Sequence, residues 1–193
     1  MSAVLVEDGP DKGAIWHFGE PVKEQRALEA GTAWADLSHL DIVAIKGEDR
    51  LTWLHALTTQ HHEQLQPGQW QEALILDPQG HVEYQFLVVD DGDTVFLVLD
   101  PGYKQTLIEY LNKMKFMLEV DVTDQSNNYA VLGYCLNESY NAYTPKPMLL
   151  YLYGESNDLS SHPIRFYDGT THQDIDSFAQ LGQDLLTKTK NIV

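Results

Sequence analysis

The sequence predicts an α+β domain with an antiparallel sheet, close to a ferredoxin-like layout. The central observation is that residues 72–99 read as three consecutive strands joined by two tight turns. A strand-like and a helix-like segment precede this meander, and a helix-like and a strand-like segment follow it. The order strand, helix, three strands, helix, strand is typical of α+β proteins with an antiparallel sheet.

The N-terminal residues 1–20 are rich in Gly, Asp and Pro and are expected to form an irregular lead-in. Trp16 and Phe18 are its large apolar residues, so we expect them to anchor it onto the body. A first helix is predicted to begin at Glu20-Pro21, because Pro is favoured in the first turn, and Gly31 suits its end.

A short strand and a second helix come next. Residues 36–40 are interpreted as a loop or a short edge segment, and the apolar residues 42–45 predict a strand that ends at Gly47. Glu48-Asp49 opens the second helix, where the helix dipole favours acidic side chains. Its apolar residues recur at helical spacing: Leu51, Trp53, Leu54 and Leu57.

The meander is defined by its turns and by alternation. Residues 77–80 (Asp-Pro-Gln-Gly) and 90–93 (Asp-Asp-Gly-Asp) carry the residues that tight turns require. Between them, apolar residues occupy one face (Val82, Tyr84, Phe86 and Val88), with Glu83 and Gln85 on the other. Leu87 and Val89 then add apolar groups to that second face, which predicts a middle strand covered on both sides.

A third helix is expected from Pro101-Gly102 onward, and residues 118–122 predict the last strand of this unit. The helix buries one apolar stripe: Leu107, Tyr110, Leu111 and Met114. A polar connector begins near residue 125, so we place a boundary between units 1–125 and 126–193. The second unit is predicted to be a partial α+β lobe, with strands at 129–134, 148–153 and 164–167 and a helix near 173–186.

Composition excludes several classes of function. The 193 residues carry a formal charge of −17, which argues against binding to nucleic acid or anionic membranes, because both require a basic patch. A single cysteine, Cys135, cannot form an internal disulfide, which fits a reducing cytoplasm. No signal peptide and no apolar run of membrane-spanning length is found. We therefore expect a cytoplasmic protein.

No motif for metal or nucleophilic chemistry is found, so we predict neither a metal site nor a catalytic residue. His61 and His62 are adjacent and should point to different sides of the chain. Phosphate-loop, dinucleotide-binding and nucleophile-elbow patterns are absent. Cys135 is best explained as a buried strand thiol, because no cationic residue flanks it to lower its pKa.

Several short segments, in this order and spacing, resemble the aminomethyltransferase (glycine-cleavage T-protein) superfamily. They are Ala35–Leu40, Lys46–Arg50, Leu57–Gln60, Leu65–Gly68 and Leu76–Gly80. The branch that they resemble most is the folate-binding YgfZ type, which is also linked to iron–sulfur cluster assembly. Three further segments resemble actinobacterial YgfZ-like sequences: Trp16–Gly19, Glu24–Gly31 and Met114–Leu118.

The resemblance implies a lobe of a three-lobed ring that holds tetrahydrofolate at its centre. The catalytic carboxylate of the T-proteins falls on Tyr84 and the neighbouring acid on Gln85, so carboxylate-dependent transferase chemistry is not expected. Four residues fall on ligand-contact positions: Leu40, Gln60, Tyr84 and Asp100. Structural roles remain open beside these, since Leu40 and Tyr84 could be core residues and Asp100 could cap a turn.

The chain departs from the YgfZ pattern at its C-terminal side. The Lys-Gly-Cys-x-x-Gly-Gln-Glu signature of that branch is absent, and Cys135 lacks those neighbours. The chain is therefore interpreted as a fragment of a longer protein or a natural short relative, with apolar surface that would favour self-association. Three interpretations stay open: a non-catalytic folate-binding protein accessory to iron–sulfur proteins, an active aminomethyltransferase, and a non-binding structural fragment.

Overall fold

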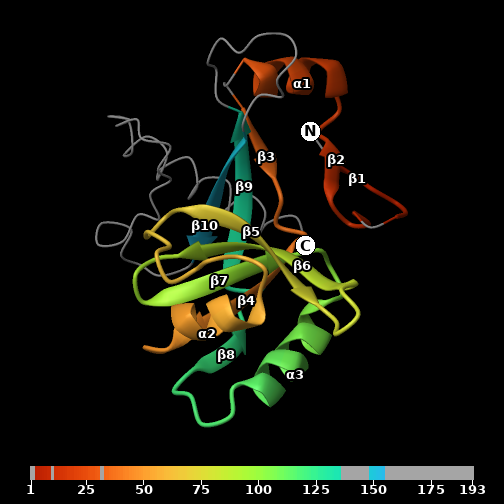
Figure 1. Cartoon of the computed structure of the whole chain (residues 1–193). Coiled ribbons are helices and arrows are strands. Elements are labelled where there is room, and N and C mark those ends of the chain that lie inside the picture. Colours follow the sequence, from red (N-terminus) through yellow and green to blue (C-terminus); the bar gives the residue numbers. More distant parts are fainter. Residues whose placement is uncertain (1–2, 10, 31–32, 136–147, 155–193) are drawn as a thin grey trace.

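The computed structural model describes residues 3–9, 11–30, 33–135 and 148–154 (Figure 1). Its centre is a five-stranded sheet in which all neighbours are antiparallel. In spatial order its strands are β5 (Trp70–Leu76), β6 (Val82–Asp90), β7 (Thr94–Leu99), β4 (Asp41–Lys46) and β8 (Asp121–Asp124). Helices α2 (Arg50–Leu57) and α3 (Lys104–Met114) lie against one face of this sheet.

The topology confirms the predicted layout. Strands β4, β6, β7 and β8, with α2 after β4 and α3 after β7, have the spatial order β8-β4-β7-β6 of a ferredoxin-like split βαβ arrangement. Strand β5 is an addition that pairs with β6 at the edge. Its partner β6 is the middle strand of the predicted meander, and the turns fall where Pro78 and Gly92 predicted them.

Both faces of the five-stranded sheet are apolar, as the alternation in β6 predicted. Phe86 and Val88 join the cluster under the helices, whereas Leu87 and Val89 contribute to the opposite face. The helix-side cluster includes Val43, Ile45, Leu54, Leu97, Leu107 and Leu111. The cluster on the second face consists of Ile42, Ala44, Val89, Phe96, Val98 and Val131.

The second face is covered by a three-stranded sheet that crosses the first (Figure 1). Its order is β10 (Met148–Gly154), β9 (Tyr129–Cys135) and β3 (Trp34–Asp36). Val131 of β9 packs into the cluster, and the rings of Phe96 and Tyr129 are 4.8 Å apart. Strand β9 begins after the predicted boundary between residues 125 and 126, yet it pairs with β3, which lies before that boundary. The boundary itself stays a prediction.

The N-terminal segment is more regular and less anchored than expected. It contains the hairpin β1 (Val4–Leu5) and β2 (Ile15–His17), followed by α1 (Pro21–Glu29). The expected anchoring by its aromatic residues is wrong, because Trp16 is 70% exposed and Phe18 is 39% exposed. The hairpin is held by its own backbone bonds instead, including Val6 N to Ala14 O at 2.9 Å.

The last strand of the sheet is also displaced from its predicted position. Strand β8 covers Asp121–Asp124, whereas residues 118–122 were expected. Phe116 has a positive φ of 46°, and the turn around it leaves Met117 98% exposed and Leu118 41% exposed. The apolar residues 116–118 therefore belong to a turn. Their hydrophobicity wrongly indicated that a strand begins at Leu118.

The predicted strands at 129–134 and 148–153 are confirmed as β9 and β10. The predicted strand at 164–167 and the helix near 173–186 lie outside the described residues. Within the described part of the chain, no helix has the length and apolar character needed to cross a bilayer.

An ion pair attaches the start of α2 to the sheet. Arg50 Nε donates to Asp90 Oδ2 at 2.7 Å and Arg50 Nη2 donates to Asp90 Oδ1 at 3.2 Å. The guanidinium also donates to the carbonyl oxygens of Gly47 and Gly92, at 3.2 and 2.8 Å. The Asp90 side chain is only 2% exposed, so the ion pair is buried. The same guanidinium therefore binds one carboxylate and the carbonyl oxygens of two turns.

Candidate functional site

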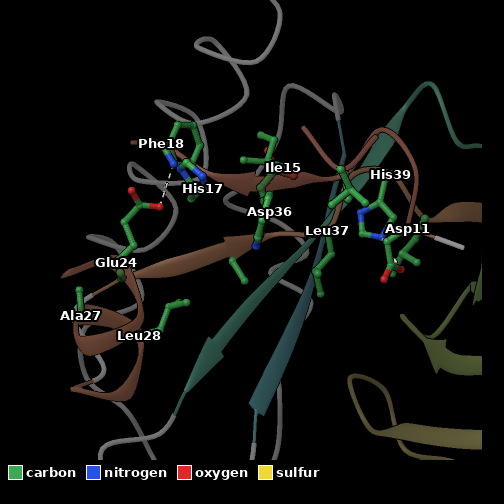
Figure 2. Close-up of a pocket in the computed structure, with 16 residues that line it drawn as sticks. Asp11, Ile15, His17, Phe18, Glu24, Ala27, Leu28, Asp36, Leu37 and His39 are labelled. Carbon is green, nitrogen blue, oxygen red and sulfur yellow. Dashed lines mark hydrogen bonds and ion pairs between the residues drawn. The ribbon is translucent and has the colours of Figure 1, made fainter. Parts of the chain in front are cut away.

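A cavity of about 550 Å³ lies between the N-terminal hairpin, α1 and the segment from β3 to Leu40 (Figure 2). Leu28, Leu37 and Leu40 contribute apolar walls. Three carboxylates, from Asp11, Glu24 and Asp36, also line the cavity. A largely apolar cavity with a few convergent polar groups is typical of small-molecule sites.

Glu24 closes one side of this cavity by joining α1 to the end of β2. Its carboxylate accepts a hydrogen bond from the backbone N–H group of Phe18 at 2.8 Å (Figure 2). It also accepts one from the backbone N–H group of Glu20 at 2.9 Å. These N–H groups precede the first turn of α1, where a carboxylate is favoured by the helix dipole. The two backbone hydrogen bonds hold the pKa of Glu24 below its ordinary value.

A histidine and an aspartate face each other at the other side. His39 Nε2 lies 3.7 Å from Asp11 Oδ1. The other ring nitrogen, His39 Nδ1, is buried and finds no hydrogen-bond partner among the described residues. A buried polar atom without a partner costs free energy unless something satisfies it. A ligand in the adjacent cavity could supply that partner.

The four predicted ligand-contact residues are not gathered in one place. Leu40 lines the cavity and also packs on the second face of the five-stranded sheet. Tyr84 packs with the helix-side cluster, where its ring lies 5.7 Å from the ring of Tyr110 on α3. Leu40 and Tyr84 therefore lie on opposite faces of the sheet.

Asp100 and Gln60 are both exposed. The ladder between β4 and β7 ends at the pair Asp41–Leu99, so Leu40 and Asp100 each lie one residue beyond that pair, at the same end of the sheet. Gln60 follows α2, and its carbonyl oxygen lies 3.1 Å from His55 Nδ1. Leu40 and Asp100 therefore lie at one sheet end. The register of β6 with β7 brings Tyr84 to the same end but on the opposite face, whereas Gln60 follows α2.

Two polar residues, Gln85 and Glu72, lie on the second face. Successive residues of a strand alternate between faces, so Gln85 shares the face of Leu87, and so does Glu72, which pairs with Leu87. Gln85 Nε2 donates to Glu72 Oε1 at 2.5 Å. The alternation in β6 predicted that Gln85 and Tyr84 lie on opposite faces, and the structure confirms it and places Leu40 on the face of Gln85.

A polar network fixes the sheet end that carries Leu40 and Asp100. The largely buried Asp41 accepts a hydrogen bond from the Gly102 N–H at 2.8 Å. Lys104 Nζ lies 3.2 Å from Asp41 Oδ1 and 3.1 Å from Asp124 Oδ2. These contacts join one end each of β4, β7 and β8 to the start of α3. The backbone at this end of the sheet is therefore fixed by contacts to three strands and one helix.

Sequence comparison places the chain in a family. Residues 15–135, more than half of the chain, match the GCVT N-terminal domain, and the chain belongs to that family. The described fold agrees with the solved structure of the glycine cleavage system aminomethyltransferase T from Bartonella henselae. The TM-score is 0.55 at 17% identity, over 68% of this chain and 36% of that one.

Individual relatives are distant and much longer. A chloroplastic protein of Arabidopsis thaliana described as a transferase is 26% identical over 130 residues, which are 64% of this chain and 29% of that protein. The aminomethyltransferase of Alkaliphilus metalliredigens is 27% identical over 113 residues, which are 58% of this chain and 31% of that enzyme. The chain thus spans less than a third of the length of these relatives.

Proposed function

We propose that this protein is a YgfZ-like tetrahydrofolate-binding protein without aminomethyltransferase activity. The observation that carries the proposal is the chemistry at the family's acidic positions, which hold Tyr84 and Gln85. Tyr84 is packed beside Tyr110 under the helices, and Gln85 is an uncharged amide on the opposite face. Neither side chain supplies the negative charge that a carboxylate would give to a developing cation.

The cavity suits one end of a reduced folate. Its volume of about 550 Å³ is in the range of small-molecule sites. The carboxylates of Asp11 and Asp36 could accept hydrogen bonds from pterin N–H and amino groups, and Leu37 and Leu40 could contact the ring. The dianionic glutamate tail would then point away from these acids, toward solvent.

Isothermal titration of the whole chain with tetrahydrofolate tests the proposal. We expect Leu40→Asp to weaken binding by more than about ten-fold, because it places a charge against the ring, at a cost above about 1.4 kcal/mol. Asp100→Ala, at an exposed position, tests the sheet end separately. The matched control is Val22→Asp on α1, which is 62% exposed and is not a lining residue of the cavity.

Absence of binding by the wild-type chain at millimolar tetrahydrofolate would contradict the proposal and favour a non-binding structural fragment. Equal weakening by Leu40→Asp and Val22→Asp would contradict the placement of the ligand. Thermal unfolding of each variant separates lost binding from lost folding.

An active folate-dependent aminomethyltransferase is the second candidate, and Glu72 is the observation that favours it. This carboxylate lies on the second face, hydrogen-bonded to Gln85, and could replace the family's missing acid. An assay of methylenetetrahydrofolate formation separates the two candidates. Turnover that is lost in Glu72→Gln would support the enzyme, whereas no turnover above background supports the non-catalytic function.

We extend the proposal to an accessory role in the assembly or repair of iron–sulfur proteins, which rests on the resemblance to the YgfZ type alone. The activity of an iron–sulfur enzyme, compared between cells with and without this protein, tests it. Full enzyme activity without the protein would contradict this role and leave the folate proposal untouched.

A further inference from the structure

The loop after α2 gathers two imidazoles and a carboxylate that lie apart in the sequence. His55, His61 and Glu63 each offer one ligand atom, and these atoms all lie within 4.8 Å of one another. The sequence reasoning found no such cluster, because His55 sits on α2 and the chain must turn to bring His61 back beside it. We propose that these three residues form a binding site for a divalent transition-metal ion, with Zn²⁺ as the best match.

The tautomer of His55 supports this role. Its Nδ1 lies 3.1 Å from the carbonyl oxygen of Gln60, and a carbonyl can only accept a hydrogen bond. Nδ1 therefore carries the proton, which leaves the lone pair on Nε2 available for a metal ion. A hydrogen bond from the second ring nitrogen to a carbonyl or carboxylate is the usual support of a metal-binding histidine.

The relative positions of the other two ligands also fit. The rings of His55 and His61 are in edge-to-face contact with centroids 4.4 Å apart, and His61 Nε2 lies 3.9 Å from Glu63 Oε2. Ligand atoms around a tetrahedral Zn²⁺ are about 3.3–3.5 Å apart, given bonds of about 2.0–2.2 Å. The side chains of His61 and Glu63 are 52% and 46% exposed, so they have room to rotate. Small rotations can therefore shorten the distance between their ligand atoms to the value that a tetrahedral ion requires.

The loop backbone is held on both sides of the cluster. Thr59 N donates to the carbonyl oxygen of Leu74 on β5 at 3.0 Å, and Leu74 N donates to Thr59 Oγ1 at 3.2 Å. His62, next in the chain to the exposed His61, is fully buried, and its Nδ1 lies 3.0 Å from Gln71 Oε1. His62 thus works as an anchor, and the loop presents His61 and Glu63 without a large ordering cost.

The donor set selects the class of ion. Imidazole nitrogens favour Zn²⁺, Co²⁺, Ni²⁺ and Cu²⁺, whereas Mg²⁺ and Ca²⁺ prefer sites made of oxygen atoms. The net charge of −17 attracts any cation to the protein. Two neutral imidazoles and one carboxylate would leave a tetrahedral ion with one open position and a net positive charge, suited to water or an anionic ligand.

Titration of the chelator-treated whole chain with Zn²⁺ alone tests the site. We expect one equivalent to bind through this cluster, with an affinity that falls by more than about ten-fold in His61→Ala and in Glu63→Gln. Mg²⁺ should not compete. Co²⁺ should show the visible absorption of a four-coordinate ion, and that absorption should be lost in His55→Ala.

The matched control is His81→Ala. His81 is also an exposed histidine beside a carboxylate, with Nδ1 2.8 Å from Asp77 Oδ2, but it is not one of the three clustered ligands. Unchanged Zn²⁺ affinity in His61→Ala and Glu63→Gln, or an equal loss in His81→Ala, would overturn the proposal. Since no folate is present, failure here does not bear on the proposed folate binding.

Discussion

The two faces of the five-stranded sheet are both apolar, yet they differ in what covers them. The first face packs against two helices, and its cluster includes fully buried residues of α2, α3 and four of the strands. The second face is crossed by β9 and by the segment that holds Leu37 and Leu40, and it carries the polar pair Gln85–Glu72. The second face adjoins the cavity, because Leu37 and Leu40 pack on that face and also line the cavity.

From this difference we infer that the two faces of the sheet have different roles. The face closed by helices holds a continuous cluster of buried apolar side chains in the described part of the chain, which stabilises the fold. A face covered by a sheet, a loop and a hairpin can keep polar side chains and a cavity, because its cover comes from several separate segments. Tyr84 packs on the first face and Leu40 on the second, although the sequence resemblance predicted both as ligand contacts.

The largest effect is expected where the helix layer is attached. Arg50→Ala leaves the Asp90 carboxylate buried without its cation, and should lower the free energy of unfolding by about 3–5 kcal/mol. Denaturant unfolding measures it. The matched control is Lys46→Ala, which removes an exposed pair with Asp93 and should lower the free energy of unfolding far less, because exposed ion pairs contribute little to stability. Similar losses in both variants would contradict a special role for the buried pair.

The next comparison uses neighbouring residues of β6. Val88 and Val89 are both fully buried, but Val88 lies in the helix-side cluster and Val89 in the second-face cluster. Truncation to Ala should cost about 1–3 kcal/mol in each case. We expect the greater loss for Val88→Ala, because a cavity under rigid helices collapses less well. A greater loss for Val89→Ala would show that the second face is the tighter core.

The smallest effect concerns the cavity wall. The pKa of Glu24 is lowered because its carboxylate accepts two backbone hydrogen bonds, so its contribution to stability is present above its unfolded pKa of about 4.5 and is lost as the pH falls through the lower folded value. Hydrogen exchange of the Phe18 and Glu20 amides should therefore lose protection in acid. Glu24→Gln should show weak protection with little dependence on pH. Unchanged protection in that variant would contradict the assignment.

Local patterns predicted most of the elements correctly. Alternation in β6 placed Phe86 and Val88 on one face and Leu87 and Val89 on the other, because side chains of a strand have a strict two-residue period. Apolar spacing and turn residues located α2, α3 and the meander. The same reasoning failed at Leu118 and Trp16, where hydrophobicity alone does not reveal that the side chain stays exposed.

The candidate site was predicted less completely. Leu40 was identified through the resemblance, and the structure places it in a cavity wall that no local pattern indicated. Gln85 was assigned only as the position of a lost acid, although its strand alternation already put it on the face opposite Tyr84. His55 was not considered, since six positions separate it from His61 and no ligand motif spans that gap.

The sequence by itself determined the order of the strands and helices of the five-stranded sheet and the acidic character of the chain, because backbone periodicity and charge are properties of neighbouring residues. Tertiary structure alone decided which residues meet: the hairpin and α1 that enclose the cavity beside Leu40, and the loop that returns His61 to His55. Such contacts depend on how whole elements pack and where the chain turns back, and no local pattern of residues records that.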